Sequence, residues 1–288
     1  MEIKVMYQEY RPLLFTLAYQ LMGTTVDAED AVQDVFVKLH SVEVDRLEEP
    51  KSYLCKMVTN RCLDHLKSAK NKREQYVGPW LPEPICTSNE DVMDIIIKND
   101  LLSYAILVLM EKLTLVERSI FVLKEALRFD YKTIASIVEK SEVNCRKIYS
   151  RAYEKLQIQK EDKTLDVPAN SEWFQAFIHA LEAGDIEQLL PLLSEDVTVF
   201  SDGGGKVPAA IYPIHSPMNV IRFLVGLMRK LPQFGEDVAV EFMTLNKQDA
   251  IVISTAKEIL VAAIVEFRGN VIENIFFVRN PDKLQSIR

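Results

Sequence analysis

The chain has 288 residues, which is enough for two or three domains of about 100–150 residues each. Its 48% hydrophobic and 26% charged residues are ordinary for a soluble globular protein. The most apolar run, residues 259–265, is too short to span a bilayer, which needs about 20 residues, and no signal-peptide pattern follows the first methionine.

The four cysteines are too scattered to suggest a metal site. Cys55, Cys62, Cys86 and Cys145 contain no CxxC pair, and the four histidines do not cluster with them. We therefore expect a reduced, cytoplasmic protein with no structural zinc and no cofactor.

The net charge of −8 is distributed unevenly. Residues 51–73 hold seven Lys or Arg against one acid, and residues 140–160 hold six against two. Residues 164–288 hold ten basic and sixteen acidic residues and so contribute −6 of the total. Local basic stripes suit DNA binding, but each stripe alone is equally compatible with a solvated helix face.

The first 73 residues have helical periodicity. Leucines recur at helical spacing up to Gly23, which favours a helix end. Acidic residues fill the first turns of a second helix, residues 27–36, where the helix dipole favours them. After Pro50, a basic helix is expected from Lys51 to about Lys70.

Residues 74–88 break this pattern. Three prolines within six residues, starting at Pro79, predict an extended linker. Ser88 or Asn89 could cap the helix that follows.

Residues 89–160 return to helical periodicity and end in a helix-turn-helix pattern. Thr114 and Glu117 form a capping box at the start of one helix. A short helix over 131–139 and a helix from Ser141 to Lys155 follow. This spacing would let one helix cross the DNA backbone while the next enters the major groove, although any small three-helix bundle has the same pattern.

From about Val167 the pattern changes. Helices are expected over 171–183 and 218–231, and alternating, β-branched runs then predict four strands, at 238–244, 250–256, 259–267 and 271–278. A hairpin turn is expected at Gly269–Asn270. Helices followed by an antiparallel meander predict an α+β domain in which a curved sheet wraps on helices.

Several segments of the first 160 residues resemble extracytoplasmic-function sigma factors of the sigma-70 superfamily. Residues 27–36 (DAEDAVQDVF) resemble that family's DAED-x-x-Q-x-x-F helix. Residues 50–64 resemble its P-x-x-W-L…A-x-N-x-x-x-D helix, with Tyr53 where Trp is commoner. Residues 113–123 and 131–156 resemble its second DNA-binding domain. The resemblance implies a subunit that directs RNA polymerase to promoters and starts transcription.

The remainder resembles a narrower subfamily whose members carry a C-terminal SnoaL-like domain. Its signatures stand at residues 80–84 (WLPEP), 202–206 (DGGGK) and 280–284 (NPDKL), while residues 245–249 depart from an expected Asn-Gly-x-Pro-Ala turn. The implied organisation is two all-α domains, 1–74 and 101–160, joined by a linker, 75–100, and followed by a SnoaL-like α+β domain of the cystatin-like cone type, 168–288.

The resemblance also implies site residues. The first helical domain would contact the beta-prime coiled coil of core polymerase, and the beta flap is a further expected contact. The expected polymerase-binding residues are Asp27, Glu29, Asp30, Gln33, Asp34 and Phe36.

Two helices are expected to bind promoter DNA. At the melted minus-ten element the candidates are Asn60, Arg61, Asp64 and Lys67, although Asp64 could equally be a local partner of Arg61. In the helix that would read the minus-thirty-five element, Val143, Ile148 and Ala152 are assigned to packing, as is Cys145. The outward candidates there are Asn144, Arg146, Lys147, Ser150 and Arg151.

The three subfamily signatures, at residues 80–84, 202–206 and 280–284, are expected to form an interdomain contact that regulates the protein. The glycine run at 203–205 lacks the GxxxxGK[ST] spacing of a nucleotide-binding loop, and Trp80 is a large apolar surface that should not stay in water. The expected regulatory residues are Trp80, Leu81, Pro82, Glu83, Pro84, Asp202, Gly203, Gly204, Gly205, Lys206, Asn280, Pro281, Asp282, Lys283 and Leu284.

Two other classes of protein remain open at this point. One is a one-component helix-turn-helix regulator with a ligand-binding domain, which would not need the acidic helix at 27–36. The other is a SnoaL-like enzyme, for which Asp202, His179 and His215 are the nearest candidates, but they make no convincing acid–base set. We therefore expect no catalytic residue, while a pocket for a small apolar ligand stays compatible with the sequence.

Overall fold

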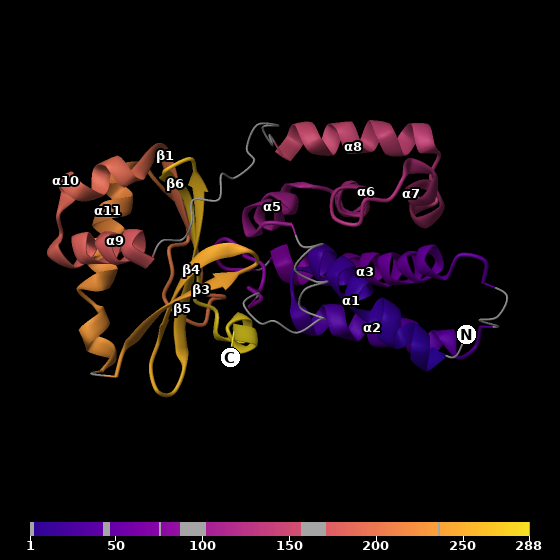
Figure 1. Cartoon of the computed structure of the whole chain (residues 1–288), viewed down its shortest axis with the longest axis horizontal. Helices are drawn as coiled ribbons and strands as arrows, with labels where there is room; N and C mark the ends of the chain where they lie inside the picture. Colours follow the sequence, from indigo (N-terminus) through magenta and orange to yellow (C-terminus); the bar gives the residue numbers. More distant parts are fainter. Residues whose placement is uncertain are drawn as a thin grey trace. The chain divides into compact units, whose positions relative to one another are not determined.

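The computed structural model describes residues 3–42, 47–74, 76–86, 102–156, 171–235 and 237–287. The chain divides into two compact units, one from residues 1–75 and 89–158 and the other from 76–88 and 159–288 (Figure 1). The predicted helix cap at Ser88 or Asn89 lies outside the described residues.

The first unit begins with three long helices, α1 (Ile3–Met22), α2 (Thr25–Leu39) and α3 (Pro50–Glu74). Their apolar side chains face inward and are almost fully buried, as at Leu17, Val35 and Leu54. Gly23 has φ +77°, a conformation that suits glycine, and lets the chain turn from α1 into α2.

The same unit continues with the helix-turn-helix segment. Its elements are α5 (Tyr104–Leu109), the 3₁₀ turn η2 (Met110–Lys112), α6 (Leu115–Glu125), α7 (Tyr131–Val138) and α8 (Glu142–Leu156). The predicted capping box is confirmed, because the Thr114 side chain accepts from Glu117 N and the Glu117 side chain accepts from Thr114 N. The predicted cap of the last helix is confirmed too, since Asn144 N donates to Ser141 Oγ over 3.3 Å.

The two helical segments of this unit pack on each other, with α6 against α1 and α7 against α3. The buried Arg118 guanidinium of α6 donates to Leu21 O (3.1 Å) at the end of α1 and to Met110 O (2.8 Å), and it also pairs with Glu111. A guanidinium that satisfies several acceptors at once fixes the angle between the elements that carry them.

The second unit is built on a six-stranded sheet of order β2-β1-β6-β5-β4-β3. The strands are β1 (Leu193–Asp202), β2 (Ile214–His215), β3 (Ala239–Leu245), β4 (Gln248–Ser254), β5 (Ile259–Arg268) and β6 (Val271–Val278). The four predicted strands are present, and Gly269–Asn270 forms the predicted hairpin turn.

The predicted antiparallel meander is confirmed for β3 to β6. The complete sheet is mixed, because the unpredicted strand β1 lies parallel to β6 and carries Asp202 as its last residue. The acidic start of this strand obscures its alternation, and its pairing partner lies far along the chain.

Helices cover one face of this sheet (Figure 1). They are α9 (Ser171–Ala183), α10 (Ile186–Leu189) and α11 (Pro217–Met228), with the 3₁₀ turns η3 (Leu190–Leu192) and η4 (Leu231–Phe234). Phe177, Leu224 and Phe277 belong to the core between these helices and the sheet. Two further turns, η5 (Pro281–Lys283) and η6 (Gln285–Ile287), follow β6.

The linker residues 76–86 also belong to the second unit, and they are extended, as the prolines predict. Leu81 to Pro84 are buried, and Cys86 forms an isolated antiparallel bridge with Leu245 at the end of β3. The linker is therefore an integral part of the C-terminal unit.

Among the residues that the structure describes, none of the helices combines the length and apolar character needed to cross a membrane.

Candidate functional site

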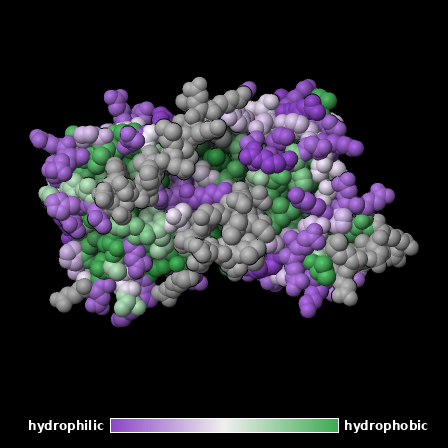
Figure 2. Space-filling model, viewed as in Figure 1, coloured by the Kyte–Doolittle hydropathy of each residue, from purple (hydrophilic) through white to green (hydrophobic). Residues whose placement is uncertain are grey.

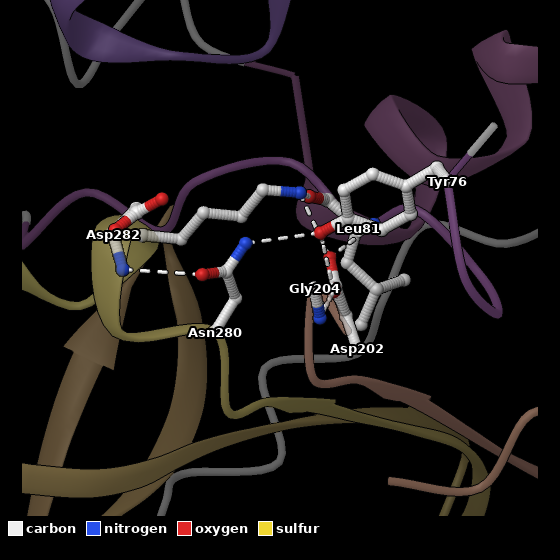
Figure 3. Close-up of polar contacts among 7 residues, drawn as sticks. Tyr76, Leu81, Asp202, Gly204, Asn280 and Asp282 are labelled. Carbon is white, nitrogen blue, oxygen red and sulfur yellow. Dashed lines mark hydrogen bonds and ion pairs between the residues drawn. The ribbon is translucent and has the colours of Figure 1, made fainter. Parts of the chain in front are cut away.

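Residues from all three subfamily signatures, at 80–84, 202–206 and 280–284, meet at the carboxylate of Asp202. It is fully buried, and it accepts hydrogen bonds from Tyr76 Oη (2.6 Å) and Leu81 N (2.9 Å) of the linker. Lys283 Nζ, from the turn η5, donates to the same carboxylate over 2.8 Å. We call the group Tyr76, Leu81, Asp202, Asn280 and Lys283 the linker clasp (Figure 3).

The ammonium of Lys283 binds the linker in three ways. It donates to Leu81 O over 2.6 Å and lies over the rings of Trp80, 4.1 Å from its centroid, and Tyr76, at 5.0 Å. Its side chain is only 7% exposed, so these charge-assisted and cation–π contacts act with little water present. The ring of Trp80, which is half-buried, is thus in contact with a buried cation.

Asn280 contacts both Asp202 and Tyr76 of the linker clasp. Its backbone N–H and that of Arg279 both donate to Asp202 O, over 2.9 and 2.8 Å. Its side-chain Nδ2 donates to Tyr76 Oη over 3.0 Å. Gly204 lies directly against it: a Cβ there would be 2.3 Å from Asn280 Nδ2, and φ is +61°. The close approach and the positive φ together require glycine at this position.

Tyr76 donates to a buried carboxylate, and this favours its neutral form. Burial, followed by the hydrogen bond to Asp202, raises the pKa of the Tyr76 phenol above its usual value of about 10. The phenol therefore stays a donor throughout the physiological pH range.

A second set of contacts holds the far end of the linker. Ile85 N donates to Asn246 Oδ1 (2.8 Å) and Asn246 N donates to Ile85 O (2.9 Å), while Ser286 Oγ donates to Pro84 O (2.9 Å). Asn246 has φ +49° and is fully buried in the β3–β4 turn, where the sequence departs from the pattern of the resembling subfamily.

Tyr76, Asn246 and Ser286 were not among the predicted site residues. An asparagine between two strands signals a turn with positive φ, so only Asn246 had a local signal.

The remaining residues of the three signatures lie around the clasp. Glu83 and Leu284 are buried, and Gly203 is confined because a Cβ there would be 2.3 Å from Val207 O. Lys206 pairs with Asp282 over 2.5 Å at an exposed surface.

The acidic helix α2 divides into an outer and an inner face. Glu29, Asp30 and Gln33 are exposed. The half-exposed Asp34 accepts from Arg61 Nε of α3 over 2.6 Å, and Asp27 lies 3.6 Å from the His65 imidazole. Phe36, the last of the expected polymerase-binding residues, is buried one turn after Val32, and its ring packs edge-on against Tyr7.

On α3, Asn60 and Asp64 are exposed one turn apart on one face. The suggestion that Asp64 is the partner of Arg61 was wrong. Asp64 accepts from Lys67 over 3.1 Å, whereas Arg61 pairs with Asp34. The Arg61–Asp34 ion pair therefore links the expected DNA-binding helix α3 to the expected polymerase-binding helix α2.

On α8, the five outward candidates are all exposed: Asn144, Arg146, Lys147, Ser150 and Arg151. Ala152 and Cys145 are buried as predicted, but assigning Val143 to packing was wrong, since it is 64% exposed in the first turn. The Arg146 guanidinium lies 5.1 Å from the Tyr131 ring centroid and pairs with Glu142 over 3.4 Å.

The candidate acid–base residues of an enzyme do not form a set. Asp202 is enclosed in the linker clasp, while His179 and His215 are exposed, the latter 3.1 Å from Thr198 Oγ1. The largely apolar cavity of this unit has no His, Asp or Glu among its described lining residues.

Comparisons with known proteins assign the two helical segments of the first unit to known families. Residues 6–72 match the model of sigma-70 region 2, and residues 103–156 match sigma-70 region 4. The extracytoplasmic-function RNA polymerase sigma factor SigJ of Mycobacterium tuberculosis (strain ATCC 25618 / H37Rv) is 32% identical over 227 residues, which are 78% of this chain and 72% of that protein. A probable sigma factor of the same type, SigI of Mycobacterium tuberculosis (strain CDC 1551 / Oshkosh), is 29% identical over 68% of each chain.

A crystal structure of the Mycobacterium tuberculosis extracytoplasmic-function sigma factor SigJ has a similar fold. It superimposes with a TM-score of 0.77 at 26% identity and covers 98% of each chain. The fold and the matched regions define the class of RNA polymerase sigma factors. The chain belongs to the extracytoplasmic-function family of these factors, which direct RNA polymerase to promoters and initiate transcription. Its C-terminal unit is the SnoaL-like α+β domain.

Proposed function

We propose that the SnoaL-like domain controls this sigma factor from within the chain, in place of a separate membrane anti-sigma factor. The observation that carries the proposal is the linker clasp. Residues 76–86 lie in sequence between the region-2 helices and the region-4 helices, so each end of the held segment leads to a DNA-binding module. A domain that grips this segment restricts the relative positions that the two modules can adopt.

The energy required for such control is modest. A shift of about 1–3 kcal/mol between two conformations changes activity several-fold or more. A hydrogen bond to a charged group contributes about 1.5–3 kcal/mol, and three of them join the linker to the domain: Tyr76 and Leu81 donate to Asp202, and Lys283 donates to Leu81 O. The linker clasp therefore supplies at least the free energy that such control requires.

The polymerase and promoter contacts follow the family pattern. We assign the outer face of α2, with Asp27, Glu29, Asp30, Gln33 and Asp34, to the beta-prime coiled coil, and region 4 to the beta flap. Phe36 supports this face from within. The minus-ten contacts are assigned to Asn60, Arg61, Asp64 and Lys67, and the minus-thirty-five contacts to the exposed residues of α8.

The functional division that this proposal uses is 1–74, 75–100, 101–160 and 168–288. The protein acts as a non-enzymatic subunit in the cytoplasm, where core polymerase and promoter DNA are found. The cavity of the SnoaL-like domain serves as a binding site for a small apolar ligand that adjusts the clasp.

Run-off transcription with purified core polymerase tests the control. We compare the parent with Trp80→Ala, Gly204→Ala and a chain truncated before Asn280. Gly269→Ala is the matched control, because Gly269 also has positive φ, +60°, but nothing lies within 4 Å of its added Cβ. Both glycine variants carry the same backbone strain, and only Gly204→Ala strikes Asn280.

We expect Trp80→Ala and Gly204→Ala to change transcription at least several-fold while Gly269→Ala does not. Truncation before Asn280 raises activity if the held state is inhibitory. Circular dichroism and upstream-element binding confirm that the DNA-binding modules remain folded. If all three variants transcribe like the parent, the SnoaL-like domain is not an intramolecular regulator.

A further inference from the structure

A cavity of about 230 Å³ lies between the helices and the sheet of the second unit. Its wall is apolar and comes from both layers, with Phe177 and Leu181 of α9, Leu224 of α11 and Val265 and Phe277 of the sheet. On the face shown in Figure 2, hydrophobic residues (green) reach the surface over the lower part of α11. Such a cavity is close to the lower end of the usual range for small-molecule sites, about 300–1,000 Å³.

The charged residues of the cavity wall are all basic among those that the structure describes. The ionisable residues that line the cavity are Lys230, after α11, and Arg279, after β6, and no acidic residue is found among the described lining residues. Lys230 is exposed, whereas Arg279 is half-buried. The cavity therefore combines an apolar interior with a cationic end.

The surroundings of Arg279 favour a bound anion. Its guanidinium donates to the carbonyl of Pro208, and within the described part of the chain it pairs with no carboxylate. Burial lowers its pKa from the usual value of about 12.5, because desolvation disfavours the charged form. An anionic ligand would supply the missing countercharge and could accept two parallel hydrogen bonds.

We propose that this cavity binds a small apolar carboxylic acid, with its hydrocarbon body against the wall of α9, α11 and the sheet and its carboxylate at Arg279 and Lys230. A neutral apolar molecule supplies neither cation with a countercharge, and an apolar amine is repelled by both. The charge pattern thus selects the class of ligand, and the cavity volume restricts its size.

The position of Arg279 connects the cavity to the linker clasp. Its backbone N–H donates to Asp202 O, and the next residue is Asn280. Its other partner, Pro208, belongs to the loop that follows Gly203–Lys206, and this loop lies beside Val77 and Gly78 of the linker. A carboxylate that draws the Arg279 side chain into the cavity therefore acts on groups that hold the clasp. This regulatory consequence rests on the proposed function, whereas binding itself does not.

Isothermal titration of the full chain with decanoate tests the binding. Decanol and decylammonium are the neutral and cationic probes of equal chain length. The variants are Arg279→Gln and Lys230→Gln. Arg229→Gln is the matched control, because Arg229 directly precedes Lys230, is exposed and does not line the cavity.

We expect decanoate to bind at least tenfold more tightly than decanol, which corresponds to about 1.4 kcal/mol. Arg279→Gln should weaken decanoate binding about tenfold and leave decanol binding unchanged, Lys230→Gln should have a smaller effect, and Arg279→Lys should restore part of the loss. Thermal unfolding identifies any variant that has not folded. Equal affinity for decanoate and decanol, equal effects of Arg279→Gln and Arg229→Gln, or no binding at all would overturn the proposal.

Run-off transcription with and without decanoate separates this inference from the proposed function. If decanoate binds as expected but Trp80→Ala, Gly204→Ala and truncation before Asn280 leave transcription unchanged, the carboxylate site is retained and the regulatory role is rejected. If these three variants alter transcription but decanoate does not bind, the regulation is retained and this ligand class is rejected.

Discussion

Asp202 and Lys283 form an ion pair with almost no exposure, their side chains being 0% and 7% accessible. Removing one partner of a buried pair leaves an uncompensated charge, which is more costly than the pair itself is stabilising. Lys206 and Asp282 form a pair of similar length a few residues away, but at 54% and 59% exposure. The two pairs offer a direct comparison between a buried and a solvated ion pair.

We predict that Lys283→Met lowers the free energy of unfolding of the C-terminal unit by about 3–5 kcal/mol, because Asp202 is left buried without its cation. Lys206→Met should change it by about 0–1 kcal/mol, as for other surface pairs. Urea unfolding followed by circular dichroism measures both. The double variant Asp202→Asn/Lys283→Met should recover part of the loss, and a double variant less stable than Lys283→Met alone would contradict the coupling.

Buried cysteines contribute to packing at the same scale. Burial raises the pKa of the Cys55 and Cys62 thiols to about 12, so almost none of either thiol ionises near neutral pH. Both side chains therefore act as small apolar residues on the inner face of α3.

Helices α2 and α8 present their functional residues on one exposed face each. In α2 the buried side is Ala28, Val32 and Val35, which leaves the acids outward at helical spacing. In α8 the buried Cys145, Ala152 and Leu156 have the same effect on the basic residues. The amphipathic pattern alone decides which face each helix offers to a partner.

For α2 we predict that the double reversal Asp30→Lys/Asp34→Lys abolishes holoenzyme formation with core polymerase. Charge repulsion replaces attraction at the contact, and a buried contact that is broken costs about 2–5 kcal/mol. Glu182→Lys/Glu187→Lys, at exposed positions of the C-terminal unit, is a control of equal charge change. Gel filtration of the mixture with core enzyme gives the answer, and comigration of the Asp30/Asp34 variant with core enzyme would refute the assignment of α2.

For α8 we predict that Arg146→Ala and Arg151→Ala each weaken binding of the holoenzyme to the minus-thirty-five element. An arginine that reads a base contributes about 1–3 kcal/mol at one base position, whereas one that contacts phosphate weakens all sequences alike and reduces the salt dependence. Titrations on parent and point-changed promoters at two salt concentrations distinguish these roles. Arg268→Ala, at the end of β5, is the control, and unchanged affinity of both α8 variants would show that this helix is not the reader.

At the scale of the whole molecule, two long-range connections set the organisation. The linker clasp joins residues 76–86 to the C-terminal unit, and Arg118 joins the region-4 helices to the end of α1. Arg118 is 4% exposed, so its contacts with Leu21 and Met110 lie in the interior of the first unit.

We predict that Arg118→Met destabilises the first unit by about 2–4 kcal/mol, because Glu111 and two carbonyl groups lose a charged donor. Hydrogen exchange should become faster at the end of α1 and in α6 together, since one side chain serves both. Lys112→Met, an exposed change next to the same turn, is the control. Faster exchange confined to α6 would mean that Arg118 does not couple the two helical segments.

Local patterns in the sequence were sufficient for much of this protein. The capping box at Thr114, the hairpin at Gly269–Asn270 and the proline-rich linker depend on neighbours within a few residues, so the sequence determines them directly. The family motifs at residues 27–36 and 50–64 are sufficient to indicate a sigma factor. The signatures at residues 80–84, 202–206 and 280–284 are equally local.

Only the tertiary structure decided which distant groups meet. Tyr76 and Asp202 are 126 positions apart, and Ile85 and Asn246 are 161 apart, so no periodicity links them. The parallel pairing of β1 with β6 depends in the same way on elements that come together only in the folded chain. A pattern of period 2 or 3.6 fixes the face on which a side chain lies, whereas its partner is chosen by packing across the whole unit.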